Sequence, residues 1–239
     1  RGKVPTLETL KNLADTLSFY KINHLELYIE HTFAFKGFSE VWSGKDPLTA
    51  EEILELDEYC QRRHIELVPS LSTFGHLYEL LVSRSYASLS EMEIDFERPF
   101  SWVDRMLHHT LDVSKEGSID TVRRMLEQFI PLFSSDKFNI CCDETFDLGK
   151  GKNKELLKQL GSGRLYMDFL KKVIALVKKY DKEVLFWGDI ILKHPEYIKE
   201  IPEGVTCLNW GYDAEVTEDS TRILAESGLK LYVCPSVQG

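Results

Sequence analysis

Short apolar runs alternate with amphipathic helical segments along almost the whole chain, and this alternation limits the possible fold more than any other feature. Helical segments show apolar residues three and four apart, as from Leu7 to Tyr20, or begin at a predicted N-cap such as Thr49 or Ser118. Strands that are separated by helices pair in parallel. The runs predicted as strands are His24 to Glu30, Ile65 to Ser70, Phe138 to Cys142, Glu183 to Trp187, Val205 to Trp210 and Lys230 to Pro235. The sequence therefore predicts an α/β fold with six parallel strands.

The ends of the predicted strands favour a barrel over an open, doubly wound sheet. Almost every strand ends in polar or aromatic residues, such as Glu30-His31 and Asp143-Glu144. In a (β/α)8 TIM barrel the carboxyl ends of the strands meet on one face, and that face carries the chemistry. No Gly-x-Gly-x-x-Gly motif follows a strand, which argues against an open dinucleotide-binding sheet.

Six strands are fewer than the eight that close such a barrel. We therefore expect residues 1–239 to form a single incomplete barrel that holds strands two to seven and lacks the first and last strands. The irregular stretch from about residue 77 to residue 117 is expected to lie over the face that carries the chemistry. Because strands at cut edges leave unpaired backbone groups, self-association through these edges is also expected.

The charge and the cysteines exclude several classes of partner and site. A formal charge of −10 argues against a nucleic-acid-binding surface and against an anionic membrane. No apolar run approaches the roughly 20 residues that span a bilayer. The five cysteines are a poor disulfide framework and include no Cys-x-x-Cys zinc motif. We expect Cys141, Cys142 and Cys207 to be buried thiols, which favours a reducing compartment, the cytoplasm, with a bacterial extracellular location as the alternative.

The adjacent carboxylates of Asp143 and Glu144 are the strongest candidates for chemistry. Neighbouring side chains of a regular strand point to opposite faces, so both can serve one site only where the strand ends and the backbone turns. Burial and the charge of one carboxylate can keep the other protonated, which separates a base from an acid. Taken alone, the pair also fits a helix N-cap or a solvated loop start.

Two tryptophans at the ends of later strands favour a carbohydrate pocket. Trp187 in "FWGD" and Trp210 in "NWGYD" are each followed by a glycine. An indole face stacks well on the C–H face of a pyranose ring, and glycine lets a loop backbone approach a ligand closely. A single instance would fit a core tryptophan with a turn glycine, whereas two instances beside a carboxylate pair predict a sugar site.

The ordered set of motifs resembles the family 20 glycoside hydrolases, the β-N-acetylhexosaminidases. "KINHLELYIEHTFAF" resembles the family's second strand with its Lys-x-Asn, and "HIELVPSLSTFGH" resembles its third strand, which ends in Gly-His. "NICCDE" resembles its Asp-Glu signature, and "FWGD" and "NWGYD" resemble the tryptophans of strands five and six. The sequence departs from the family at Asn139, which replaces a histidine, at Ser72, which replaces an aspartate, and at Cys141 and Cys142, which replace small residues or glycines.

The resemblance implies a substrate-assisted retaining hydrolysis of terminal β-linked N-acetylglucosamine or N-acetylgalactosamine. Glu144 would be the general acid and base, and Asp143 would orient the 2-acetamido group of the substrate. Neither a metal nor an organic cofactor is implied. The implied partners are N-acetylhexosamine-containing glycans or glycoconjugates, not nucleic acid or membranes. The implied sugar contacts are Glu30, His76, Trp187, Trp210, Tyr212 and Asp213.

Two other functions stay open at this point. A non-catalytic carbohydrate-binding barrel would keep both tryptophans but would have lost turnover through the changes at Asn139 and Ser72. A metal-dependent barrel hydrolase would use His31, His76 and Asp143 as ligands, and chelation would then abolish its activity.

Overall fold

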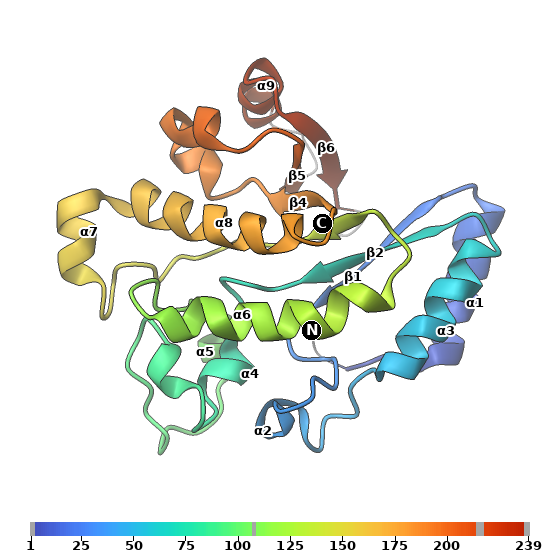
Figure 1. The fold of residues 1–239 in the computed structure, drawn as a ribbon, viewed down its shortest axis with the longest axis horizontal. Coiled ribbons are helices and arrows are strands. Elements are labelled where there is room, and N and C mark those ends of the chain that lie inside the picture. Colours follow the sequence, from blue (N-terminus) through green and yellow to red (C-terminus); the bar gives the residue numbers. More distant parts are fainter. Residues whose placement is uncertain (1–2, 107–108, 214–217, 237–239) are drawn as a thin grey trace.

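The computed structural model describes residues 3–106, 109–213 and 218–236. Its centre is a parallel sheet of six strands that lie side by side in chain order. The sheet curls into a half-barrel, consistent with the truncated (β/α)8 TIM barrel that the sequence predicts (Figure 1). The strands are β1 His24–Ile29, β2 Glu66–Leu71, β3 Lys137–Asn139, β4 Glu183–Trp187, β5 Val205–Gly211 and β6 Lys230–Pro235.

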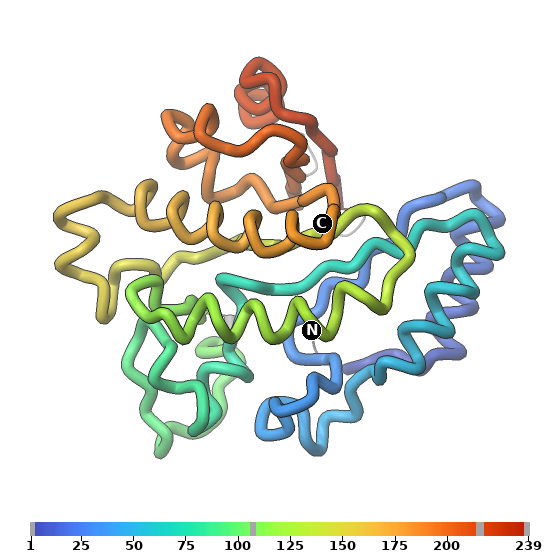
Figure 2. Tube along the Cα trace, in the orientation of Figure 1, coloured from blue at the N-terminus to red at the C-terminus, as the bar shows by residue number. Residues whose placement is uncertain are grey.

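Helices follow the strands and cover the outer side of the curled sheet. The longer helices are α1 Leu7–Phe19, α3 Ala50–Gln61, α6 Glu116–Phe129, α8 Ser162–Lys178 and α9 Glu218–Glu226. Shorter helices and 3₁₀ turns connect them: α2 Ser39–Trp42, α4 Tyr78–Leu81, α5 Trp102–Met106, α7 Lys154–Leu160, η1 Ala87–Leu89, η2 Ile130–Leu132, η3 Ile191–Lys193 and η4 Pro195–Glu200. Figure 2 shows the chain winding in one direction, from the blue segments on the right through green below to orange and red above. Within the described residues, no helix has the length and apolarity needed to cross a membrane.

Capping chemistry sets where the helices begin. Thr49 caps α3 as predicted, because its hydroxyl accepts from the Glu52 N–H while its own N–H donates to the Glu52 carboxylate at 2.9 Å. The predicted N-cap at Ser118 is wrong. Helix α6 begins at Glu116, and Ser118 lies buried in its first turn, where its hydroxyl donates to the Asp112 carbonyl at 2.6 Å.

The curl of the sheet brings its two outer strands, β1 and β6, toward each other. The ring of His24 in β1 meets the ring of Tyr232 in β6, with centroids 6.0 Å apart. Side chains from both outer strands and from β2, β4 and β5 line a hollow of about 530 Å³, which we call the interior hollow. Tyr28, Ser70 and Trp187 are among its walls.

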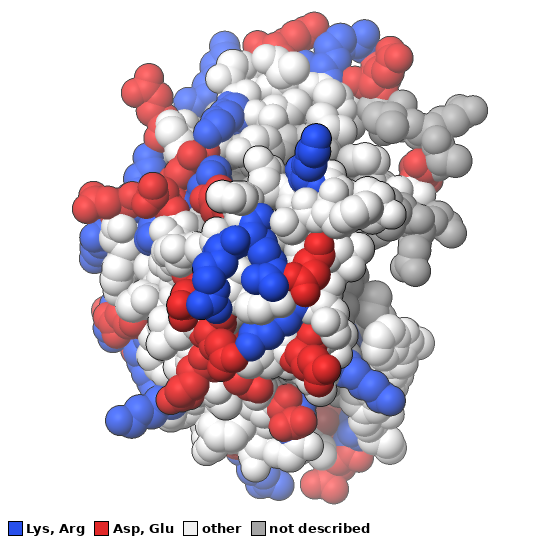
Figure 3. Space-filling view, turned by 90° about the vertical axis from the view of Figure 1, so that its right-hand side faces the viewer, with Lys and Arg blue, Asp and Glu red and all other residues white. Residues whose placement is uncertain are grey.

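The remaining surface of the sheet packs against the outer helices and forms the main core. Phe138 of β3, Phe129 of α6 and Leu170 of α8 are at most 2 % exposed. The outward-facing sides of the helices carry acidic and basic side chains in a mixed pattern. Figure 3 shows this pattern on the face that α1 and α3 form. Exposed ion pairs of the kind found there contribute at most about 1 kcal/mol each.

The irregular stretch between β2 and α6 returns to the carboxyl end of β2. The N–H of Leu77 donates to the His109 carbonyl at 3.0 Å, and the N–H of Leu111 donates to the Phe74 carbonyl at 3.1 Å. These two bonds place the returning segment beside the end of β2, at the edge of the sheet where the site residues gather.

Candidate active site

Four of the predicted site residues meet at the carboxyl ends of the first three strands. Nε2 of His76 lies 2.9 Å from Oε2 of Glu144 and 3.3 Å from Oδ2 of Asp143. Nδ1 of the same ring lies 3.6 Å from Oε1 of Glu30. The guanidinium of Arg105 in α5 completes the group, 3.3 Å from Oε2 of Glu30. We call these five residues the His76 cluster; its histidine side chain is only 2 % exposed, so the polar neighbours of the ring are mainly carboxylates rather than bulk water.

A left-handed turn after β3 explains how two neighbouring carboxylates reach one histidine. In a regular strand Asp143 and Glu144 would point to opposite faces. β3 instead ends at Asn139, not at Cys142 as predicted, because the backbone leaves the strand. The angle φ is +58° at Cys141, +61° at Cys142 and +47° at Glu144. Such a conformation costs about 1–2 kcal/mol for a residue with a Cβ atom, so neighbouring groups must hold it.

Hydrogen bonds and burial hold this turn. The Asn139 side-chain oxygen accepts from the Cys141 N–H at 2.8 Å, and the hydroxyl of Tyr166 in α8 donates to the Cys142 carbonyl at 3.0 Å. Both thiols are fully buried, and burial raises the pKa of Cys141 and of Cys142 above the usual value. The prediction that these two thiols and Cys207 are buried is confirmed.

Asp143, which follows β3, is held by Tyr28 of β1, two strands away in the sheet. The Tyr28 hydroxyl donates to both carboxylate oxygens of Asp143, at 3.1 and 3.2 Å. Burial, and after it the charge of Asp143, raises the pKa of Tyr28 well above its usual value, so the hydroxyl keeps its proton. Trp187 lines the same interior hollow, and its buried Nε1 has no hydrogen-bond partner among the described residues. The indole N–H of Trp187 is therefore a buried donor without a partner in a side chain that lines this hollow.

Asp189 belongs to the site although the sequence analysis did not select it. Its Oδ2 accepts from the Glu144 N–H at 3.0 Å, and its Oδ1 is buried without a hydrogen-bond partner in the described part of the chain. Burial, and next the charge of Asp143, raises the pKa of Asp189 from 3.8 to about 7. A signal was available, because Asp189 ends the same "FWGD" motif from which Trp187 was selected.

Two other members of the site had no sequence signal. Tyr28 lies within the apolar run of β1, and Arg105 lies in the irregular stretch, 75 positions from Glu30. A carboxylate does lie beside Nδ1 of His76 although Ser72 replaces the aspartate that the resemblance implies. The carboxylate beside Nδ1 comes from the end of β1 instead.

The structure places three predicted sugar contacts apart from these charged groups, at the end of β5. The ring of Trp210 lies 5.1 Å from that of Tyr212, centroid to centroid, and the two are tilted by 54°. Tyr212 is 66 % exposed, and Asp213 is exposed as well. The contact of Trp210, Tyr212 and Asp213 with a sugar stays a prediction.

The site also has the spacing of a possible cation site. His76, Asp143 and Glu144 each offer one ligand atom, and these atoms lie within 4.8 Å of one another. His31, which the metal hypothesis includes, is not in this group. Its Nδ1 lies 3.9 Å from Glu30, and burial lowers the pKa of His31 to about 4. The spacing alone thus suits both proton transfer and metal binding.

Comparison with known proteins assigns the family. Residues 4–238 match glycosyl hydrolase family 20, catalytic domain. The chain belongs to glycosyl hydrolase family 20. It is 23% identical over 235 residues to hexosaminidase D of Bos taurus, covering 95% of this chain and 64% of that protein. It is 24% identical over 225 residues to hexosaminidase D of Homo sapiens, covering 90% of this chain and 44% of that protein.

The fold of this family 20 chain is also that of solved structures. It superposes on the chitobiase of Flavobacterium johnsoniae with a TM-score of 0.73 at 20% identity, over 95% of this chain and 35% of that one. The predicted family and the predicted fold class, a (β/α)8 TIM barrel represented by six strands, are therefore confirmed. The chain spans less than two thirds of the length of each of these three relatives.

Proposed function

We propose that this family 20 chain belongs to a glycoside hydrolase that removes terminal β-linked N-acetylhexosamine from glycans or glycoconjugates. The observation that carries the proposal is the meeting of two neighbouring carboxylates, Asp143 and Glu144, at Nε2 of His76. Such a pair supplies the two carboxyl groups that this chemistry needs, one to transfer a proton and one to stabilise developing positive charge. The names of the two similar mammalian proteins, hexosaminidase D, support the substrate class.

In this proposal Glu144 is the general acid and base. Its carboxyl group protonates the glycosidic oxygen as the bond to the anomeric carbon breaks, and it later takes a proton from the attacking water. Two contacts support this role. His76 lies within hydrogen-bond reach of Oε2, at 2.9 Å, and Asp189 anchors the backbone N–H of Glu144.

Asp143 is assigned to the 2-acetamido group of the substrate. In substrate-assisted hydrolysis the acetamido oxygen attacks the anomeric carbon, and positive charge develops on the acetamido group. A fixed carboxylate next to the acetamido N–H orients this group and stabilises the charge. Tyr28 holds both oxygens of Asp143, and the interior hollow of about 530 Å³ beside Tyr28 and Trp187 has room for a sugar ring.

The decisive test is hydrolysis of an aryl β-N-acetylglucosaminide by the whole protein, wild type against Glu144→Gln. We expect the rate to fall by about two to four orders of magnitude, because the amide cannot donate the proton. Glu155→Gln is the matched control, since this glutamate lies on α7 with its side chain 76 % exposed. A Glu144→Gln variant with the wild-type rate would remove Glu144 from the mechanism.

The acetamido requirement gives a second test. A substrate with a 2-hydroxyl group in place of the 2-acetamido group lacks the internal nucleophile, so the wild type should not hydrolyse it. Asp143→Asn should slow hydrolysis of the acetamido substrate. Sugar binding without hydrolysis of any substrate would favour the non-catalytic carbohydrate-binding barrel instead.

A second candidate, a metal-dependent hydrolase, rests on one observation. The ligand atoms of His76, Asp143 and Glu144 are close enough to share a divalent cation. A metal-bound water would then be the nucleophile, and the substrate's acetamido group would not be needed. The substrate without this group therefore separates the two candidates.

A further inference from the structure

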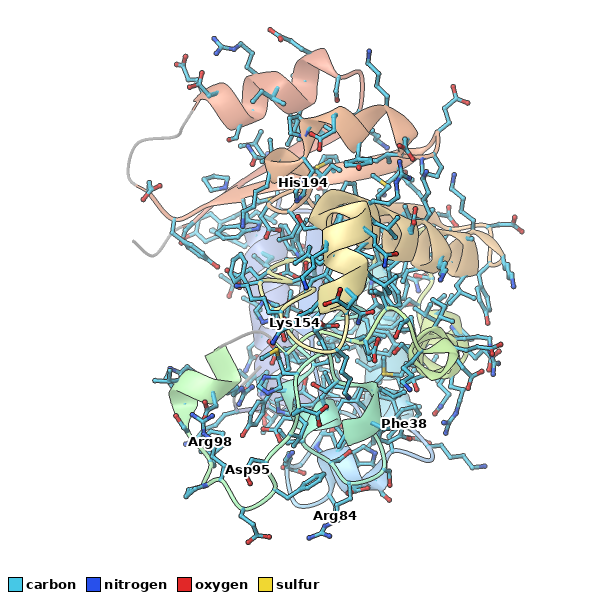
Figure 4. All side chains as sticks on the ribbon, turned by 90° about the vertical axis from the view of Figure 1, so that its left-hand side faces the viewer. Phe38, Arg84, Asp95, Arg98, Lys154 and His194 are labelled. Atoms are coloured by element: carbon cyan, nitrogen blue, oxygen red, sulfur yellow. The ribbon has the colours of Figure 1, made fainter. Side chains whose placement is uncertain are left out.

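The connection from β3 to α7, which carries both carboxylates of the site, is an irregular segment. It starts after Asn139, the last residue of β3, and ends at Lys154, the first residue of α7, which Figure 4 labels. Because the regular strand stops before Asp143, the positions of the two carboxylates depend on individual contacts with neighbouring segments. The contacts that hold the left-handed turn therefore also decide where Asp143 and Glu144 lie.

The side-chain amide of Asn139 is bonded at both of its ends. Oδ1 accepts from the N–H of Cys141, the residue at which the left-handed turn begins with a φ of +58°. Nδ2 donates to Oε2 of Glu26 in β1 at 2.7 Å. Asn139 is fully buried, so this amide is shielded from water. It links the first left-handed residue of the turn to β1.

Glu26 determines which way the Asn139 amide faces. A carboxylate only accepts hydrogen bonds, and a backbone N–H only donates them. If the amide turned over, its oxygen would face the Glu26 carboxylate and its NH2 group would face the Cys141 N–H. Both contacts would be repulsive, and a buried backbone donor would lose its acceptor. Glu26 thus favours the one amide orientation that can hold the turn.

The carboxylate of Glu26 is itself held on its other side. Nε2 of His24 lies 2.8 Å from Oε1 of Glu26, and the Glu26 side chain is only 15 % exposed. With both oxygens engaged, the carboxylate has little freedom to leave the Asn139 amide.

Strand β1 contacts the turn before and after its strained part. Glu26 and Tyr28 are two positions apart, so their side chains leave β1 on the same face, and both line the interior hollow. Glu26 bonds Asn139 before the turn, and Tyr28 bonds Asp143 after it. Both side chains reach past β2, which lies between β1 and β3 in the sheet. The left-handed cysteines therefore lie between two attachments to β1.

We propose that Glu26 is a positioning residue for the proposed reaction: through Asn139 it holds the turn in the shape that brings Glu144 to the glycosidic oxygen. This inference rests on the proposed hydrolase function. Glu26 acts on the reaction through the turn and not on the substrate. Its removal should lower kcat and leave KM nearly unchanged, because Tyr28 still holds Asp143, the residue assigned to the acetamido group.

The first test measures kcat and KM of the whole protein on phenyl β-N-acetylglucosaminide. In Glu26→Leu we expect kcat to fall about five- to fiftyfold, because a displaced turn misplaces the general acid. Glu26→Gln keeps an acceptor oxygen for Asn139 and should stay within about threefold of the wild-type kcat. Glu183→Leu is the matched control, since Glu183 pairs with Lys230 at 2.5 Å and with the Thr206 hydroxyl at 2.6 Å, at the start of β4. A wild-type kcat in Glu26→Leu would overturn the positioning role.

A second test reverses the hydrogen bond. Asn139→Asp keeps an acceptor for the Cys141 N–H but sets a second carboxylate against Glu26, so kcat should fall. Adding Glu26→Gln supplies an NH2 donor to the new carboxylate, so the double variant should regain most of the lost kcat. A double variant that is no more active than Asn139→Asp would show that the two side chains do not act as a pair, which would also overturn the proposal.

A third test separates positioning of the acid from general support of the fold. A leaving group of low pKa departs without full protonation and so depends less on the general acid. The loss in Glu26→Leu should therefore be smaller on the 2,4-dinitrophenyl glycoside than on the phenyl glycoside, with urea unfolding to show that the variant is folded. Equal losses on both would overturn the positioning role and leave the hydrolase function intact. A wild type that hydrolyses neither glycoside would overturn both.

Discussion

The carboxylate of Glu30 lies 3.6 Å from Nδ1 of His76, while the other nitrogen of that ring faces the carboxylate pair. Arg105 holds Glu30 in turn, at 3.3 Å. The strand ends of β1, β2 and β3 and the helix α5 therefore contribute to one continuous arrangement of charges. At 3.6 Å the Glu30 carboxylate acts on the ring through its charge rather than through a hydrogen bond, and it favours the ring position that presents Nε2 to Glu144.

Removing the charge of Glu30 should loosen this arrangement. In Glu30→Gln we expect kcat to fall about ten- to a hundredfold, because a misplaced His76 no longer positions the general acid. Glu66→Gln is the control, since Glu66 pairs with Lys137 at 2.6 Å at the amino end of β2. The measurement is kcat on the aryl glycoside, with unfolding in urea to show that both variants are folded. Equal kcat values for the two variants would contradict the orienting role.

The left-handed turn makes Cys142 intolerant of β-branched side chains. Cys142→Val should destabilise the protein by about 1–3 kcal/mol more than Cys60→Val, because valine is strained at φ +61°. Cys60 is a matched control, since it is also fully buried but lies within the helix α3. Urea unfolding of both variants measures the difference. Similar losses in both would mean that the backbone at Cys142 relaxes easily.

The raised pKa of Asp189 predicts a pH-dependent stability. Because its pKa is about 7 in the folded protein and 3.8 for a free aspartate, the folded state binds the proton more tightly in this range. The contribution of Asp189 to the free energy of unfolding is complete below about pH 4 and is lost as the pH rises through 7. Asp189→Asn removes this loss, so its stability relative to wild type should rise by up to a few kcal/mol between pH 4 and pH 7.

Unfolding in urea at a series of pH values measures this effect. Asp168→Asn is the control, because Asp168 is an exposed acid on α8 that pairs with Arg164 at 3.2 Å. Parallel stability curves for wild type and Asp189→Asn would show that Asp189 titrates like a free aspartate.

Metal removal should leave the activity unchanged. The proposed mechanism uses only side chains and the substrate's own acetamido group, so no step requires the cation that His76, Asp143 and Glu144 could hold. The rate on the aryl glycoside is compared before and after dialysis against a chelator, and after Zn²⁺ is added back. An activity that disappears on dialysis and returns with Zn²⁺ would favour the metal-dependent hydrolase.

Elements with a clear start and end in the sequence were predicted closely. β4 and β6 have the predicted bounds, because each is an apolar run that follows a turn at the end of a helix. The end of β3 was not predicted, since cysteine in "FNICC" resembles any other apolar strand residue and nothing local announces a left-handed backbone. The turn exists because Tyr166 of α8 and other neighbours hold it.

The order of helices and strands, the parallel sheet and the motifs at the strand ends all follow from local sequence patterns, because periodicity and turn residues act over short distances along the chain. The contacts of the site come from the folded chain, in which Tyr28 holds Asp143, Arg105 holds Glu30 beside His76, and Asp189 anchors Glu144. These contacts join segments that lie far apart in the sequence. They depend on the curl of the sheet and on the dihedral angles of one strained turn, which residue types alone do not specify.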